Sequence, residues 1–115
     1  MLEAVGGREE SDPQSEMSRV LLLNPEARAD VAAASTWYEN QRPGLGVEFL
    51  AALEECLSRI QEHPLGYHPI HRQVRRVSLR RFPYQVYYTF RPEQVHIWAV
   101  LHGSRDPQEW RRRVR

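Results

Sequence analysis

The sequence contains no lysine, a single cysteine and no long hydrophobic run. Without lysine, mechanisms that use a lysine amine as nucleophile or base are excluded. The lone Cys56 cannot form an internal disulfide, which excludes a disulfide-stabilised fold and fits a reducing cytoplasm. The longest apolar runs, residues 20–23 and 97–101, are much shorter than the roughly 18–20 residues that cross a bilayer. We therefore expect a cytoplasmic protein that has no membrane partner.

The first residues also lack the apolar segment of a secretory signal, because MLEAVGGREE is acidic. Residues 1–16 contain Gly-Gly and Asp-Pro steps and several charges but no apolar period, so they are predicted to be a disordered tail. Residues 17–115 are predicted to form one domain, because a chain of 115 residues with 41% hydrophobic and 27% charged content suits a single globular core.

Charge is distributed unevenly along the chain, although the net charge is only +1. Residues 1–71 carry five Arg against twelve Asp and Glu, a net charge of −7. Residues 72–115 carry eleven Arg against three acidic residues, a net charge of +8. A basic C-terminal portion of this kind predicts a surface for phosphates or for an acidic protein partner.

Two stretches in the first half have the period of an amphipathic helix. Residues 19–23 precede them as a short apolar strand, and Asn24-Pro25-Glu26 is typical of a helix start capped by Asn24. The first stripe, which runs to about Asn40, comprises Ala27, Val31, Ala34 and Tyr38. The second comprises Leu45, Phe49, Leu53, Leu57 and Ile60, with Cys56 beside it as a small core residue. Pro43 and Gly44 predict a tight turn over residues 41–44, so the two helices are expected to form a hairpin.

The second half changes to an alternating period, which predicts strands. Residues 63–71 come first and are predicted to form a loop, because they contain two X-Pro steps. Strands are expected over residues 77–79, 84–90 and 95–102, joined as an antiparallel meander. In the last strand, alternation predicts one face with Val95, Ile97, Ala99 and Leu101, and the opposite face with His96, Trp98, Val100 and His102. Asp106-Pro107 is expected to cap a short terminal helix.

The element order β-αα-βββ, followed by that short helix, predicts an α+β fold of two layers with an antiparallel sheet. The helical hairpin is expected to pack on one face of the sheet, because each helix has one apolar stripe. The other face is expected to be open and lined by Arg, Tyr, His and Trp side chains. That face is therefore the expected working surface.

A metal or cofactor site is not predicted. His63, His68 and His71 lie close together in the sequence, but their segment contains no Cys or acidic residue to complete four zinc ligands. We expect a solvated loop there, no metal and no small-molecule cofactor.

Several segments, in this order, are similar to those of a known family. They are NPEARADV at residues 24–31, the apolar stripe that ends in His63-Pro64, RRFPYQVYYTF at residues 80–90 and VHIWAVLHGSRDPQEW at residues 95–110. Together they resemble the RelE/ParE superfamily of bacterial toxins from type II toxin-antitoxin modules, over residues 19–110. Arg81-Phe82-Pro83-Tyr84 and the last strand most resemble the ParE, or plasmid stabilisation, branch.

This resemblance implies a small toxin encoded beside an antitoxin that wraps and neutralises it. Members of the superfamily either poison DNA gyrase or cut mRNA on the ribosome. The residues favour gyrase binding, because the chain lacks the lysines of the nuclease members and its late aromatic residue, Trp110, cannot exchange a proton. A ribosome-dependent mRNA endonuclease and a degenerate, non-toxic antitoxin-binding module remain alternatives, so whether the chain is an enzyme stays open.

Cleavage of RNA by its own 2′-OH needs a base, a fixed positive charge at the phosphorane and a proton donor. If the chain is a nuclease, the catalytic candidates are His102 as base or acid, and Arg81 and Arg105 as a phosphate clamp. The structural alternative is that these side chains only pack and pair. Tyr87 or Trp110 is the candidate to stack a base. The wider nucleic-acid or partner surface is predicted to comprise Arg76, Arg80, Tyr87, Trp110, Arg111, Arg112 and Arg113.

Overall fold

The computed structural model describes residues 19–114, so the predicted tail at residues 1–16 lies outside the described residues. Its elements are β1 (Val20–Leu23), α2 (Pro25–Gln41), α3 (Leu45–Glu62), the 3-10 turn η1 (Pro64–Gly66), β2 (Pro69–His71), β3 (Val74–Ser78), β4 (Tyr84–Arg91), β5 (Gln94–His102) and α4 (Gln108–Arg111). None of the helices in this part of the chain is both long and apolar enough to span a membrane. Both long helices begin and end within about one residue of the predicted positions.

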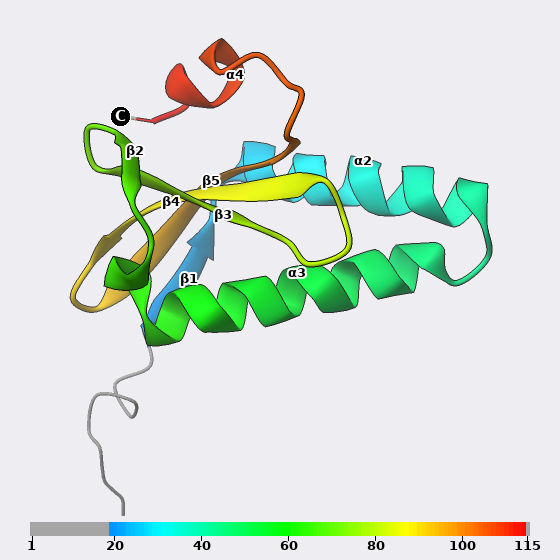
Figure 1. Ribbon diagram of the computed structural model, residues 1–115, viewed down its shortest axis with the longest axis horizontal. Coiled ribbons are helices and arrows are strands. Elements are labelled where there is room, and N and C mark those ends of the chain that lie inside the picture. Colours follow the sequence, from blue (N-terminus) through cyan, green and yellow to red (C-terminus); the bar gives the residue numbers. More distant parts are fainter. Residues whose placement is uncertain (1–18, 115) are drawn as a thin grey trace, which may run out of the picture.

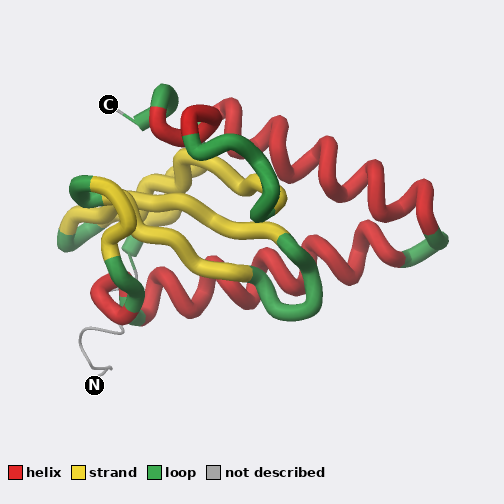
Figure 2. The backbone as a smooth tube through the Cα atoms, turned by 45° about the horizontal axis from the view of Figure 1, so that its top comes forward, coloured by secondary structure: helices red, strands yellow, loops and turns green. Residues whose placement is uncertain are grey.

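Within residues 19–114, five strands form one sheet in the order β1-β5-β4-β3-β2. The β3-β4-β5 meander is antiparallel, as predicted, and β1 joins its edge parallel to β5. Helices α2 and α3 lie along one side of this sheet, and their hairpin extends past its edge (Figures 1 and 2). The two-layer α+β prediction is therefore confirmed.

The prediction that residues 63–71 are only a loop is wrong at its C-terminal end. Pro69–His71 forms the edge strand β2, which pairs with β3. Pro69 is compatible with a strand there because the edge leaves one side of the backbone without a ladder partner. Strand β3 also begins earlier than predicted, at Val74 instead of Val77.

The turn between α2 and α3 is held by one carboxylate. Pro43 ends α2, and Gly44 adopts a left-handed φ of 89°, which glycine tolerates without steric cost. The Glu39 carboxylate accepts hydrogen bonds from the backbone N–H groups of Gly44 and Gly46 at 3.0–3.1 Å. A Cβ at Gly46 would lie 2.7 Å from the carbonyl oxygen of Ser35, so glycine allows the two helices to approach closely. The predicted Asn24 cap of α2 differs, because its side chain donates to Glu26 instead of capping.

The main core lies between the helices and the sheet. The predicted stripe of α3 is buried there, including Phe49 and Ile60, which are fully buried. The ring of Phe49 stacks on Tyr38 of α2 and meets Phe82 edge-on. Cys56 is fully buried in the same layer, and burial raises the pKa of its thiol to about 11. Cys56 is therefore an unreactive core residue, as predicted.

A β-bulge in β5 changes which residues face the helices. Tyr87 pairs with Ala99 but Tyr88 pairs with Ile97, so Trp98 is an extra residue on β5. Beyond this point the alternation is reversed: Val100 packs into the helix-facing core, whereas Ala99 and Leu101 face away from the helices. The predicted faces of these three residues were wrong, because simple alternation cannot anticipate a bulge.

The helix-free face of the sheet carries a second, smaller core at one end. Trp110 of α4 stacks on Tyr87 with ring centroids 5.1 Å apart and an interplanar angle of 18°. Val74, Ala99 and Leu101 complete this cluster. The carboxylate of Asp106 accepts from the backbone N–H of Gln108 at 2.9 Å, in the predicted capping position. The prediction of an open second face is therefore wrong for this half of the sheet.

A buried ion pair fastens the C-terminal segment. Strand β1 ends at Leu23, which leaves the continuing edge of β5 without a strand partner. Asp30 of α2 accepts from the backbone N–H of Val100 at 2.9 Å. Arg113 donates to Asp30 at 2.7 Å and to the carbonyl oxygen of Trp98 at 3.3 Å. These two side chains thus satisfy the strand edge that β1 does not reach.

Candidate functional site

The predicted catalytic histidine lies at the end of β5. The Nδ1 atom of His102 accepts a hydrogen bond from the backbone N–H of Ser104 at 3.0 Å and lies 2.8 Å from the Ser104 hydroxyl. Because Nδ1 is an acceptor here, the neutral ring carries its hydrogen on Nε2. This hydrogen bond would have to break before Nδ1 could accept a proton from a substrate hydroxyl, whereas Nε2–H can still donate one.

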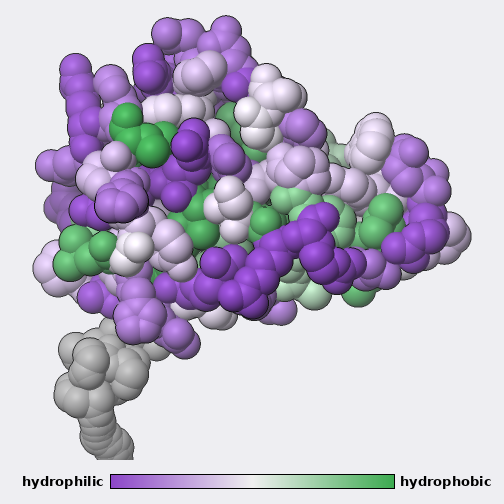
Figure 3. All heavy atoms as spheres, in the orientation of Figure 1, coloured by the Kyte–Doolittle hydropathy of each residue, from purple (hydrophilic) through white to green (hydrophobic). Residues whose placement is uncertain are grey.

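The two arginines predicted to clamp a phosphate form ion pairs with two different helices. Arg81 donates to Glu48 of α3 at 2.9 Å, and Arg105 lies 3.4 Å from Glu109 of α4. Hydrogen bonds from Arg81 and Arg42 lower the pKa of the Glu48 carboxyl, which keeps it ionised at neutral pH. On the face shown in Figure 3, hydrophilic side chains cover much of the surface where the sheet meets α3. Each of these two guanidinium groups therefore has a carboxylate partner, which it shares with at least one other arginine.

Most of the predicted nucleic-acid surface is also neutralised or buried. Arg80 pairs with Glu55 at 3.2 Å and Arg112 pairs with Glu109 at 3.1 Å. Tyr87 and Trp110 are each only 4% exposed, and Arg113 is 7% exposed. The expected exposure of these three residues is thus wrong, because α4 folds back onto the sheet. Arg76 and Arg111 are exposed and have no carboxylate partner within residues 19–114.

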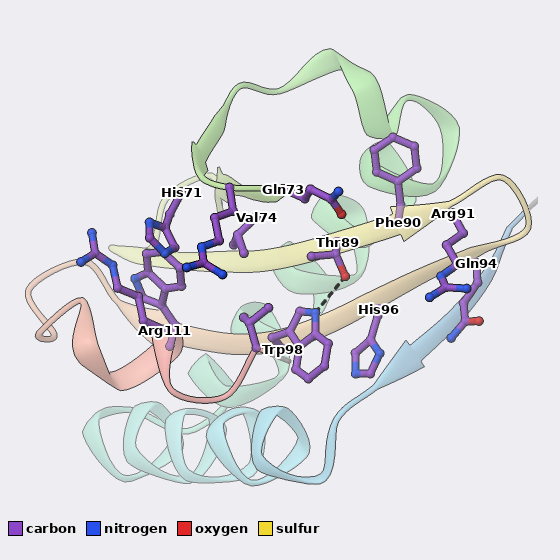
Figure 4. A pocket seen from close by; sticks show the side chains of 13 residues that line it. His71, Gln73, Val74, Thr89, Phe90, Arg91, Gln94, His96, Trp98 and Arg111 are labelled. Atoms are coloured by element: carbon purple, nitrogen blue, oxygen red, sulfur yellow. Dashed lines mark hydrogen bonds between the residues drawn. The ribbon is translucent and has the colours of Figure 1, made fainter.

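The open half of the helix-free face contains a groove of about 740 Å³. It lies between the β2–β3 turn, the ends of β4 and β5, and α4, as Figure 4 shows. Its lining residues are His71, Arg72, Gln73, Val74, Thr89, Phe90, Arg91, Gln94, His96, Trp98, Trp110, Arg111 and Val114. We call this site the arginine groove, because three arginines and no acidic residue line it. Its volume is in the usual range of ligand pockets, about 300–1,000 Å³.

Two rings lie in the middle of the arginine groove (Figure 4). The His96 and Trp98 rings stack in parallel, with centroids 3.8 Å apart and an interplanar angle of 3°. The Trp98 indole N–H donates to the Thr89 hydroxyl at 2.9 Å. The Nε2 atom of His96 is buried and has no hydrogen-bond partner among the described residues. Burial lowers the pKa of His96, so this ring is neutral at pH 7.

Sequence reasoning placed Trp110 and Arg111 in the predicted binding surface, and placed His96 and Trp98 together on one face of the last strand; all four line the arginine groove. It missed Arg72 and Arg91 because both lie in or beside turns, outside the alternating stretches. The excess of arginine over acid in residues 72–115 was the available signal, but it did not show which arginines lack partners.

Apolar surface gathers on the opposite side of the molecule, along the outer face of α3. A shallow depression there is lined by Val47, Leu50, Ala51, Leu53, Glu54 and Leu57. Val47 is 69% exposed and Leu50 is 41% exposed. Edge strand β1 likewise exposes Val20 and Leu22. Exposed apolar patches of this kind are typical of protein–protein interfaces.

Comparisons with known proteins agree with this architecture. The family model described as "ParE toxin of type II toxin-antitoxin system, parDE" matches residues 21–107. Toxin ParE2 of Mycobacterium tuberculosis, strains CDC 1551 / Oshkosh and H37Rv, is 27% identical over 92 residues, which cover 79% of this chain and 88% of that protein. A solved structure described as "Chromosomal ParDE TA system from P. aeruginosa" has a TM-score of 0.65 at 18% identity, covering 75% of this chain and 97% of that one. At that identity the structural match supports the fold.

Proposed function

Because this chain belongs to the ParE toxin family of type II toxin-antitoxin systems, we propose that it arrests growth by binding DNA gyrase in the cytoplasm. We further propose that a cognate antitoxin neutralises it. Gyrase is the target that the ParE branch implies, and binding it requires no catalytic group on the toxin.

The state of the predicted nuclease residues is the main support for a binding toxin. A ribonuclease of this kind needs cations that are free to stabilise the phosphorane. Arg81 and Arg105 each face a carboxylate within 3.4 Å, and the only acceptor nitrogen of His102 is occupied. The ring stacking proposed for Tyr87 and Trp110 is made between the two rings themselves. These contacts support a binding toxin over a nuclease.

The exposed apolar surfaces support an antitoxin partner. The depression on α3 suits the apolar face of an amphipathic helix, and the free edge of β1 suits an added strand. Val47 and Leu50 would be covered in such a complex, which removes apolar surface from water.

Inducible expression in a bacterial host tests the target. One culture is sampled for growth, for a DNA-damage reporter and for the 5′ ends of its transcripts. Growth arrest with an active reporter and intact mRNA is expected, and purified gyrase should lose supercoiling activity when the chain is added. His102→Ala and Arg81→Ala should arrest growth as the parent does, because a binding toxin does not depend on the candidate catalytic groups. Co-expression of the adjacent antitoxin gene should restore growth.

Either of two other results would contradict the proposal and identify a different function. Cut transcripts that disappear with His102→Ala would identify an mRNA endonuclease. Unchanged growth, with the soluble chain shown to accumulate, would identify a non-toxic antitoxin-binding module.

A further inference from the structure

The arginine groove gathers three arginines that have no carboxylate partner among the described residues, whereas Arg28 and Arg76, which also have none, lie outside it. Arg72 comes from the β2–β3 turn, Arg91 from the end of β4 and Arg111 from α4, so three separate elements deliver a charge to one concavity. All three are exposed and have no carboxylate partner among the residues the structure describes. Seven other arginines do have one: Arg42, Arg59, Arg80, Arg81, Arg105, Arg112 and Arg113.

Unpaired guanidinium groups around a concave surface attract anions, because the low-dielectric walls focus the positive potential. Guanidinium groups also bind phosphate oxygens through two parallel hydrogen bonds. Because no carboxylate among the described residues pairs with Arg72, Arg91 or Arg111, their N–H groups are free to bind an anionic ligand.

The remaining lining residues favour a ligand that carries more than negative charge. Gln73, Gln94 and Thr89 can each donate and accept hydrogen bonds, which the edges of nucleobases require. The half-buried His96 has a ring nitrogen without a partner, and a buried polar atom left unpaired costs free energy until a ligand supplies one. An acidic peptide could also pair these groups through its backbone, so the poly-glutamate competition described below separates the two kinds of ligand.

The backbone at the rim is in a strained conformation at Arg72, as it is at Arg81 outside the groove. The φ of Arg72 is 54°, in the left-handed region where glycine is favoured and a side chain with a Cβ is strained. An arginine at such a position is retained at a cost in stability, which is a pattern seen at functional sites.

We propose that the arginine groove binds a segment of single-stranded nucleic acid, with phosphates held by Arg72, Arg91 and Arg111 and a base hydrogen-bonded within the groove. Binding of this kind does not depend on which protein the toxin inhibits. DNA and RNA share the chemistry that the groove recognises, so both are tested.

Fluorescence anisotropy with a 12-nucleotide, 5′-labelled single strand of mixed sequence, as DNA and as RNA, measures this binding. The full chain is made by cell-free synthesis, so that growth inhibition does not limit its yield. Three phosphate contacts predict that the logarithm of affinity falls with the logarithm of salt concentration with a slope of about −2. Affinity should therefore fall about 18-fold between 50 and 200 mM NaCl.

The double variant Arg72→Gln/Arg91→Gln should reduce the salt slope to about −0.7, because one phosphate contact remains. The control Arg28→Gln/Arg42→Gln removes the same charge from exposed positions outside the groove and should keep the parental slope. Arg72→Gly is a third variant whose folding is not in question, because glycine suits the backbone at this position. It should bind the strand more weakly while melting no lower than the parent.

Two outcomes would overturn the proposal. Equal loss of affinity in both double variants would mean that the strand responds to net charge and not to this groove. Displacement of the strand by a poly-glutamate peptide of higher affinity, with the same dependence on Arg72 and Arg91, would assign the groove to an acidic protein segment. Neither measurement involves gyrase or growth, so failure here is distinguishable from failure of the proposed target.

Discussion

The two halves of the helix-free sheet face contain the same types of residue. In one half these residues are buried and paired, and in the other half the arginines are exposed and unpaired among the described residues. At the α4 end, rings are buried against each other and Arg113 is paired with Asp30 and Glu109. The arginine groove, which runs from α4 to the other end of this face, keeps three arginines without carboxylate partners among the described residues, around a histidine with an unsatisfied nitrogen. An arginine-rich, aromatic stretch of sequence can therefore build a core at one end of a sheet and a binding surface at the other.

The difference between the halves comes from the C-terminal segment. Helix α4 folds onto the sheet over Tyr87 and stops before it reaches His96. Glu109 lies within 3.4 Å of Arg105, Arg112 and Arg113, so one carboxylate serves three cations. Partial burial opposes ionisation of Glu109, but Arg112, Arg105 and Arg113 together lower its pKa below the usual value. The covered half is thus held together by charge as well as by ring packing.

The largest expected effect tests whether the covered half is a true core. Trp110→Ala should lower the free energy of unfolding by about 3–5 kcal/mol, because it removes a buried indole and leaves Tyr87 unpacked. Trp37→Ala is the matched control, since Trp37 is 57% exposed on α2, and it should change stability by no more than about 0.5 kcal/mol. Urea denaturation monitored by circular dichroism measures both. Equal losses in the two variants would show that α4 contributes no core.

A smaller effect is expected from the ion pair at the edge of β5. Arg113→Met should cost about 3 kcal/mol, because Asp30, with a side chain only 11% exposed, loses its cation. Arg112→Met breaks a pair at an exposed arginine, and should cost less than about 1 kcal/mol. The midpoints of urea unfolding compare the two. If Arg112→Met lowers the free energy of unfolding as much as Arg113→Met, the contact between Arg113 and Asp30 is not what stabilises the C-terminal segment.

The smallest effect concerns the open half. His96→Phe should raise the free energy of unfolding by about 1 kcal/mol at pH 7.5, because it removes a buried nitrogen without a partner but keeps a ring against Trp98. The exposed His68→Phe is the control and should change little. If His68→Phe raises the free energy of unfolding and His96→Phe does not, the unpaired nitrogen of His96 does not destabilise the fold.

The pH dependence of the same variant sharpens the comparison. Because burial lowers the pKa of His96 in the folded state, the unfolded state binds a proton more readily. The parent should keep its full stability above pH 6.5, the usual histidine pKa, and lose stability as the pH falls below it. His96→Phe should lose less between pH 7.5 and pH 5, as unfolding midpoints at each pH will show.

Most of the fold could be predicted from local patterns. The stripe Phe49, Leu53 and Ile60 recurs at a helical period, and Val86 and Tyr88 alternate at a strand period, so each segment shows the face it will bury. What local patterns missed was the extra residue Trp98 in β5. The reversed faces of Ala99 and Val100 depend on where the neighbouring strand loses register, which is a property of two strands and not of one.

The candidate site was less predictable than the fold. Arg81 was expected to bind phosphate, but it meets Glu48, which lies 33 residues away in the sequence. Arg113 was expected on the surface, but it reaches Asp30, 83 residues away. Arg72 and Arg91 have the same side chain as these two and no comparable partner among the described residues. Residue type therefore identified the basic half of the chain but not its free cations.

The sequence alone determined the order of the elements, the apolar faces of both long helices and the family, because periodicity and short motifs are properties of neighbouring residues. Only the tertiary structure decided which arginines are paired and which rings are buried. Each of those outcomes depends on a carboxylate or a ring that the folded chain brings from a distant segment, within the few ångströms over which an ion pair or a stacked ring stabilises a protein.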